Sequence, residues 1–123
     1  MNQTTEIFHQ LQSLLNGHIP PLQRRKDNGD SVEYAGTKEA MQGKQKVDGF
    51  YFASLVTKPA DVRFYFFPIY THAENFSDLS EPLKKFLKGK SCFHIKYLNE
   101  ELQTEINSMV EKGIQLYLKD GLL

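Results

Sequence analysis

The sequence predicts an α+β fold: a two-layer sandwich whose mainly antiparallel sheet carries the N- and C-terminal helices packed on one face. The first observation is a ring-rich stretch, Gly49 to Tyr70, which divides into two strand-like runs around the segment Lys58-Pro59-Ala60-Asp61. That composition is typical of a β-hairpin whose turn angle is set by proline. The second observation is an amphipathic helical pattern near each end of the chain, which gives such a sheet its cover.

The hairpin is expected at the centre of the sheet. Alternate residues of its first run form two sets, Phe50, Phe52, Ser54 and Val56 on one face and Tyr51, Ala53 and Leu55 on the other. Neither set is polar enough for a fully solvated surface, so at least one face must be covered by other elements.

The first helix is predicted from apolar residues at helical spacing, namely Ile7, Phe8, Leu11, Leu14 and Leu15. Thr4 or Thr5 is expected to cap its start, and Gly17 to end it. The following segment, residues 19–22, contains two consecutive prolines and is therefore expected to be extended.

The region before the hairpin is less regular. Arg24 to Asp30 is predicted to be a solvated loop with a turn at Asn28-Gly29, and the alternative is a phosphate or acidic-partner contact made by its three cations. Ser31 to Gly36 alternates as an edge strand would. Thr37 to Asp48 is polar, and extended structure with a turn near Gly43 is favoured over one helical turn.

After the hairpin, Pro68 is expected to end the second strand, and Tyr70 to Ser77 to form a loop. Leu79 to Leu87 fits a short helix capped by Ser80, with Gly89 as its stop. Ser91 to Tyr97 alternates as a half-buried strand. A long final helix is predicted to begin after Asn99 as its cap, with Gly113 allowing close approach to another element.

Charge and cysteine content limit the class of protein. The 123 residues include 15 Lys and Arg and 15 Asp and Glu, so no net field favours nucleic acid or an anionic membrane. The length suits one domain, residues 1–123. One cysteine fits a reducing compartment, and neither a signal peptide nor a membrane-spanning run is recognised. We therefore expect a cytoplasmic single domain with no nucleic-acid or membrane partner.

A metal site is the first chemical hypothesis. Cys92 and His94 lie two apart on a predicted strand and so share a face, and His72 follows the hairpin. A thiolate and two imidazoles suit zinc or another borderline metal. The ordinary alternative is a buried cysteine beside a partly exposed histidine. A catalytic Cys92 is a further alternative, although neither a helix N-terminus nor an acidic residue that would orient His94 is evident.

A small-ligand site is the second hypothesis. Lysines crowd the short helix and the strand after it, namely Lys84, Lys85, Lys88, Lys90 and Lys96. Such a rim suits a phosphate or carboxylate group, with Lys90, His72 and Tyr70 as the candidate ligand-binding residues. The chain also has abundant rings, which could line a pocket for a flat ligand or simply fill the core. Glu6, Glu100, Glu101 and Glu105 are candidate oxygen ligands for a hard cation, or solvated helix charges.

The second half of the chain resembles a known group. The run Phe64-Tyr65-Phe66-Phe67-Pro68, the helical segment Leu79 to Leu87, and Gly89-Lys90-Ser91-Cys92-Phe93-His94-Ile95 look like the signature of the YdhG-like family of small bacterial domains. The resemblance spans roughly Phe50 to Leu118. In the first half, Tyr34-Ala35-Gly36-Thr37 only partly matches the motif that the family carries there. The resemblance implies a frataxin-like fold and, from one family member, an iron-chaperone role.

Three functions compete at this stage. The first is a non-enzymatic binding domain, with iron handling implied by the resemblance. An iron role would need acidic residues on the first helix, however, and the sequence has Glu6 alone there. The second is a metal or thiol enzyme that uses Cys92, His94 and His72. The third is a protein-interaction module, most simply a homodimer. A binding domain with a small-molecule or protein partner is favoured because no catalytic constellation is recognised.

Overall fold

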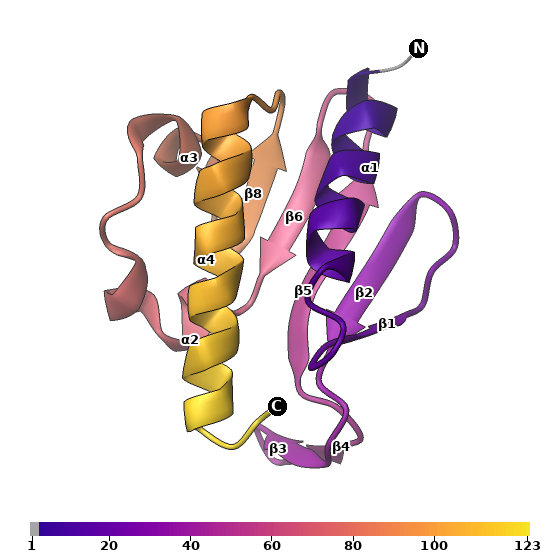
Figure 1. Ribbon diagram of the computed structural model, residues 1–123, viewed down its shortest axis with the longest axis vertical. Coiled ribbons are helices and arrows are strands. Elements are labelled where there is room, and N and C mark those ends of the chain that lie inside the picture. The colour runs from indigo at the N-terminus through magenta and orange to yellow at the C-terminus, as the bar shows by residue number, and fades with distance from the viewer. Residues whose placement is uncertain (1–2) are drawn as a thin grey trace.

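A computed structural model describes residues 3–123 and shows an antiparallel sheet with two long helices on one face (Figure 1). The predicted α+β class is confirmed. Helices α1 (Gln3–Asn16) and α4 (Glu100–Lys119) lie side by side over the sheet. Between them, His18 Nε2 and Asn107 Oδ1 are 3.0 Å apart. Met1 and Asn2 of the predicted domain lie outside the described residues.

The central position of the ring-rich hairpin is confirmed. The large sheet has six strands, in the order β1 (Gln23–Arg25), β2 (Ser31–Ala35), β5 (Tyr51–Thr57), β6 (Val62–Phe66), β8 (Cys92–Ile95) and β7 (Leu87–Lys88). The other elements are the small hairpin β3 (Ala40–Gln42) and β4 (Gln45–Val47), and the short helices α2 (Pro68–Thr71), η1 (Ala73–Phe76) and α3 (Glu81–Phe86). β5 and β6 therefore occupy the two middle places of the sheet.

The core lies between the sheet and the two long helices, and aromatic rings fill its centre. Phe64 of β6 packs on Phe66 and on Phe93 of β8, with ring centroids 5.6 and 6.0 Å apart. Phe52 of β5 meets Tyr117 of α4 edge to face at 5.8 Å. All five side chains are fully buried. The removal of these apolar rings from water is the main stabilising contribution to the fold.

The starts of α3 and α4 follow the predicted caps, whereas Thr4 and Thr5, expected to cap the first helix, lie inside α1. Ser80 Oγ accepts a hydrogen bond from the Leu83 amide at the start of α3, and Asn99 Oδ1 accepts one from the Leu102 amide at the start of α4. Gly113 marks the predicted close approach. A Cβ atom at Gly113 would lie 2.9 Å from both Phe66 Cζ and Pro68 Cγ, so α4 could not sit this close to the sheet with a larger residue.

Three predictions in the first half were wrong. Residues 19–22, expected to be extended, instead follow α1 as turns up to residue 21, and the Leu22 amide donates to the His18 carbonyl. Arg24 and Arg25 belong to strand β1, not to a loop, because Arg25 pairs with Glu33 of β2 and donates its Nε hydrogen to that carboxylate. As a result, β2 is an inner strand and not the edge. The turn at Asn28-Gly29 is confirmed, with Gly29 at φ 96°. The segment of residues 37–48 is extended as favoured, since it forms the β3–β4 hairpin around Gly43.

In the second half, the segment predicted as a loop is mostly helical. Strand β6 ends before Pro68 as expected, but Pro68 then opens α2, where the missing amide hydrogen of proline costs nothing. Helix η1 follows directly. Helix α3 ends at Phe86, and Leu87 passes into the edge strand β7, because its backbone has turned extended (φ −72°, ψ 114°).

Candidate functional site

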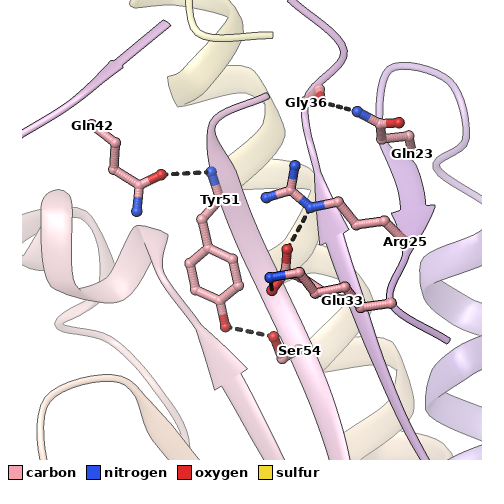
Figure 2. Close-up of polar contacts among 8 residues, drawn as sticks. Gln23, Arg25, Glu33, Gly36, Gln42, Tyr51 and Ser54 are labelled. Atoms are coloured by element: carbon pink, nitrogen blue, oxygen red, sulfur yellow. Dashed lines mark hydrogen bonds and ion pairs between the residues drawn. The ribbon is translucent and has the colours of Figure 1, made fainter. Parts of the chain in front are cut away.

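The side of the large sheet that faces away from the long helices is the candidate site. Figure 2 views this side: α4 runs behind β5, while Arg25, Glu33, Tyr51 and Ser54 lie in front of the strands. We call it the helix-free face, because no helix of residues 3–123 covers it. It is defined by the row Arg25, Glu33, Ser54, Tyr65, Cys92 and Lys88 and by the neighbouring pair Arg63 and His94.

Strand register explains why these side chains share one face. Each residue of the row is the direct cross-strand partner of the next, from β1 through β8 to β7. Direct partners in an antiparallel pair project to the same side of the sheet. Arg63 and His94 are also partners, two residues from Tyr65 and Cys92, so they fall on the same side. Most of these side chains are half-buried, and Lys88 is exposed.

Charges on the helix-free face are only partly matched. Glu33 is bound by Arg25 and lies 3.7 Å from Lys26 Nζ. At the other end of the sheet, Asp61, which is 5% exposed, accepts a hydrogen bond of 2.7 Å from Arg63 Nε. Both acids are thus already paired with arginine. Lys88 beyond them adds positive charge toward the β7–β8 edge.

Aromatic rings line the end of this face where β6 leads into α2. The rings of Tyr51 and Phe67 are 5.4 Å apart, and Phe67 and Tyr70 stack at 5.7 Å with planes 25° apart. Lys90 Nζ lies 5.7 Å from the centre of the Tyr70 ring, a cation–π geometry. Tyr70 is 52% exposed. Two of the three predicted ligand-binding residues, Lys90 and Tyr70, are therefore brought together.

His72, the third predicted ligand-binding residue, has a different role. Its Nε2 lies 2.7 Å from Asp120 Oδ2 and its Nδ1 lies 2.8 Å from Thr71 Oγ1. Thr71 Oγ1 in turn lies 2.9 Å from the hydroxyl of Tyr117. Both ring nitrogens are engaged, so His72 ties the α2 segment to the C-terminal end of α4 and does not join Lys90 and Tyr70.

The three predicted metal ligands do not form one site. Cys92 and His94 share a face of β8 as expected, but His72 is held by Asp120. Within residues 3–123, no three His, Cys, Asp or Glu side chains are gathered in a way that could hold a metal ion. The carboxylates of α4 do not act together as metal ligands either, because Glu105 already accepts hydrogen bonds from the amide and hydroxyl of Ser80.

The environment of Cys92 does not favour nucleophilic chemistry. Burial raises the pKa of the Cys92 thiol, and the neighbouring Tyr65 hydroxyl and Arg63 guanidinium oppose this effect only in part. A raised pKa keeps the thiol protonated at neutral pH, whereas catalytic cysteines require the thiolate. Cys92 is therefore a half-buried member of the row.

The tyrosine and histidine on this face are held in their neutral forms. Burial raises the pKa of Tyr51 to about 12, although its hydroxyl lies 2.7 Å from Ser54 Oγ. Burial also lowers the pKa of His94, and the positive charge of Arg63 lowers it further, while Asp61 acts in the opposite direction. Neutral His94 and Tyr51 leave arginine and lysine as the main source of charge here.

Two surface hollows differ in what lines them. One, of about 650 Å³, is lined by Asn99, Glu100, Glu101, Thr104 and Glu105. All of its walls come from the start of one helix, so it cannot enclose a ligand. The other, of about 230 Å³, lies on the helix-free face between β2 and β5, next to Lys26 and Asn28. Buried side-chain polar atoms of residues 3–123 all have partners, so the interior offers no ligand-recognition group.

Several residues of the candidate site were missed from the sequence. Arg63 and Tyr65 alternate with Val62, Phe64 and Phe66 along β6. This period-two pattern indicates that Arg63 and Tyr65 lie opposite the buried rings. Asp61 gave no such signal, because its burial depends on the turn that follows β5, where the Lys58 amide donates to the Asp61 carbonyl.

Comparison with protein-family models, curated proteins and solved structures finds no match for this chain. No helix among residues 3–123 combines the length and the apolar character needed to cross a lipid bilayer. The geometry of the helix-free face is therefore the basis for any functional inference.

Proposed function

We propose that this protein is a non-enzymatic binding domain that takes a small anionic ligand bearing an aromatic ring on the helix-free face of its sheet. The observation that carries the proposal is the combination of half-buried rings and unmatched cations on one side of the sheet. Rings supply flat contact area, and cations supply the charge that an anion needs.

Charge complementarity favours an anionic ligand over a cationic one. The two acids of this face, Glu33 and Asp61, are already paired with Arg25 and Arg63. Lys88 and Lys90 are not paired with an acid among residues 3–123. An incoming anion therefore meets net positive charge, whereas a cation would be repelled.

Ring stacking also favours a ligand that carries an aromatic ring. The Tyr51, Phe67 and Tyr70 rings form a continuous series that ends at an exposed ring beside Lys90. Tyr70, 52% exposed at the end of this packed series, offers exposed ring area to a flat ligand. Lys90 adds positive charge at this end of the face.

The proposal is tested with 1-anilinonaphthalene-8-sulfonate, a fluorescent probe that combines aromatic rings with one negative charge. We expect saturable binding to the folded protein, and about fivefold or greater weakening in Tyr70→Ala, since loss of an aromatic contact is worth roughly 1 kcal/mol or more. Tyr97→Ala is the matched control. Tyr97 is also exposed, at 41%, but packs on Phe86 of α3. Equal weakening in both variants, or no saturable binding, contradicts the proposal.

A frataxin-like fold and an iron-chaperone role form a second proposal, which is supported by the family resemblance and by the packing of both terminal helices on one face of the sheet. The edge strand β1 speaks against the iron role, because Arg24 and Arg25 occupy it and cations repel a metal ion. Titration with ferrous iron without oxygen is the test. Binding weaker than millimolar would count against it.

A thiol enzyme is the third candidate, and the raised pKa of Cys92 speaks against it. The test is the rate at which Ellman's reagent modifies Cys92 at pH 7. A rate at least tenfold below that of free cysteine supports the non-enzymatic proposal. A rate above that of free cysteine would instead favour an activated thiol.

A homodimer built on the sheet is the remaining alternative. The edge strand β1 carries arginines, which protect sheet edges from pairing with a second chain. We expect light scattering to report a monomer over a hundredfold range of protein concentration. A concentration-dependent rise in mass would favour the interaction module.

A further inference from the structure

We propose that Arg63, His94 and Lys88 form a subsite for a single oxyanion, the phosphate or carboxylate group of the ligand. This inference rests on the proposed function, because it names the part of the helix-free face that would bind the negative charge.

Asp61 positions the subsite from below the surface. Its carboxylate is almost fully buried, at 5% exposed, and its two oxygens serve different partners. Oδ1 accepts the 2.7 Å hydrogen bond from Arg63 Nε, and Oδ2 lies 3.7 Å from His94 Nδ1. A buried carboxylate that faces both a guanidinium and an imidazole limits the rotation of each. Asp61 is therefore a positioning residue and does not need to contact the ligand.

The groups left over are the ones that an oxyanion needs. Arg63 uses Nε for Asp61, so its two terminal nitrogens have no protein partner among residues 3–123. Those nitrogens form the planar fork that matches two oxygens of a phosphate or carboxylate. The Arg63 side chain remains 31% exposed and the His94 side chain 23% exposed, so solvent and ligands can reach both.

Neighbouring lysines add charge without competing acids. Arg63 and His94 face each other across β6 and β8, and Lys88 of β7 is the partner of Cys92 beside them. Lys96 lies two residues after His94 along the chain, and the pKa of His94 is lowered by burial first and then by Arg63, Lys88 and Lys96. The acid that lies beside His94 is Asp61, and it is already bonded to Arg63. The positive charge of Arg63, Lys88 and Lys96 exceeds the single negative charge of Asp61, so an anion is favoured beside them.

Tyr65 lies beside the subsite on the helix-free face. Arg63 and Cys92 each flank Tyr65 on the helix-free face, and Cys92 lies near Tyr51. A ligand that places its oxyanion on Arg63 can therefore lay a flat ring along the tyrosines of the same face. This arrangement links the subsite to the ring-bearing ligand proposed above.

The test follows backbone amide shifts of the full chain in a titration with inorganic phosphate and, in a parallel arm, with acetate. Potassium chloride holds the ionic strength constant, because screening would otherwise weaken any charge interaction. We expect saturable shifts at Arg63, Lys88 and His94 with at least one anion. Which anion binds more tightly tells whether the subsite prefers a phosphate or a carboxylate. Shifts that stay linear and equal over the whole surface would overturn the proposal.

Variants make the test specific. Arg63→Gln should weaken anion binding about tenfold or more, since a hydrogen bond between charged groups is worth roughly 1.5–3 kcal/mol. Arg63→Lys keeps the charge but loses the fork, and should weaken binding by less. Arg24→Gln is the matched control, because Arg24 is a β1 cation paired with Asp27. Unchanged affinity in both folded Arg63 variants would overturn the subsite.

The two proposals fail in different ways. If the naphthalenesulfonate probe binds through Tyr70 but no oxyanion titrates the Arg63 region, the subsite is wrong and the proposed function stands. If phosphate or acetate binds at Arg63 but the probe does not bind, the subsite stands and the aromatic ligand is wrong. Loss of both would remove the helix-free face as a ligand site.

Discussion

The two faces of the same six-stranded sheet differ in what their side chains do. Phe64, Phe66 and Phe93 on the helix-covered face are fully buried and contact one another and the helices. Arg63, Tyr65 and Cys92 on the helix-free face are their immediate neighbours in sequence, yet they are half-buried and polar. Strand alternation separates the two sets by one residue, so the buried core and the proposed binding residues lie on opposite sides of the same strands.

The two faces of the sheet also differ in how well they tolerate substitutions. On the covered face each ring is enclosed by other rings, and α4 approaches so closely that Gly113 has no room for a side chain. On the helix-free face most side chains are half-buried and reach solvent, so truncating one leaves no enclosed cavity. We therefore expect large effects on folding from the first face and mainly effects on binding from the second.

The largest contrast is expected between neighbouring residues of β6. Phe64→Ala should lower the free energy of unfolding by about 3–5 kcal/mol, because it leaves a cavity under α1 and α4. Tyr65→Ala should cost much less, about 1 kcal/mol, because its side chain is only half-buried. Urea unfolding of both variants measures the difference. Equal losses would mean that the helix-free face is covered in solution.

Gly113→Ala tests how tightly helix α4 packs on the covered face of the sheet. An added methyl group would lie 2.9 Å from Phe66 and Pro68, and overpacking costs about 1–3 kcal/mol. The better helix propensity of alanine returns about 1 kcal/mol. We expect a net loss of about 1 kcal/mol in urea unfolding. Ser108→Ala on the exposed side of α4 is the control, and it should be neutral or slightly stabilising.

His72→Ala tests the connection between α2 and α4. It removes the contacts to Asp120 and Thr71, and we expect a loss of about 1 kcal/mol or less because the pair is exposed to solvent. His9→Ala on the exposed side of α1 is the matched control. A ligand role for His72 would appear instead as weakened probe binding with unchanged stability.

The smallest effect concerns the pH dependence of stability. Burial and Arg63 lower the pKa of His94 in the folded protein below its ordinary value of 6.5. The unfolded chain therefore binds more protons below about pH 6.5, and the free energy of unfolding falls as the pH drops. His94→Gln should remove this part of the loss between pH 7.5 and 5.5 in urea unfolding. An unchanged pH dependence would show that His94 is as solvated as in the unfolded chain.

Local signals determined much of the fold from sequence. The cap residues Ser80 and Asn99 and the ring-rich hairpin act through groups within a few residues, so their outcomes follow from the sequence itself. The wrong predictions for β1 and β2 concern partners distant in the chain. Arg24 and Arg25 became a strand because β2 pairs with them, and nothing within residues 24–30 encodes that pairing.

In the candidate site too, some features follow from the sequence and others from the folded chain. The sequence by itself placed Cys92 and His94 on one strand face and identified Lys90 and Tyr70 as ligand-binding candidates. Only the tertiary structure decided that His72 binds Asp120 and that Asp61 is buried beneath Arg63 and His94. The physical reason is that period-two alternation is a property of one strand, whereas burial and charge pairing depend on which strands and helices lie beside it.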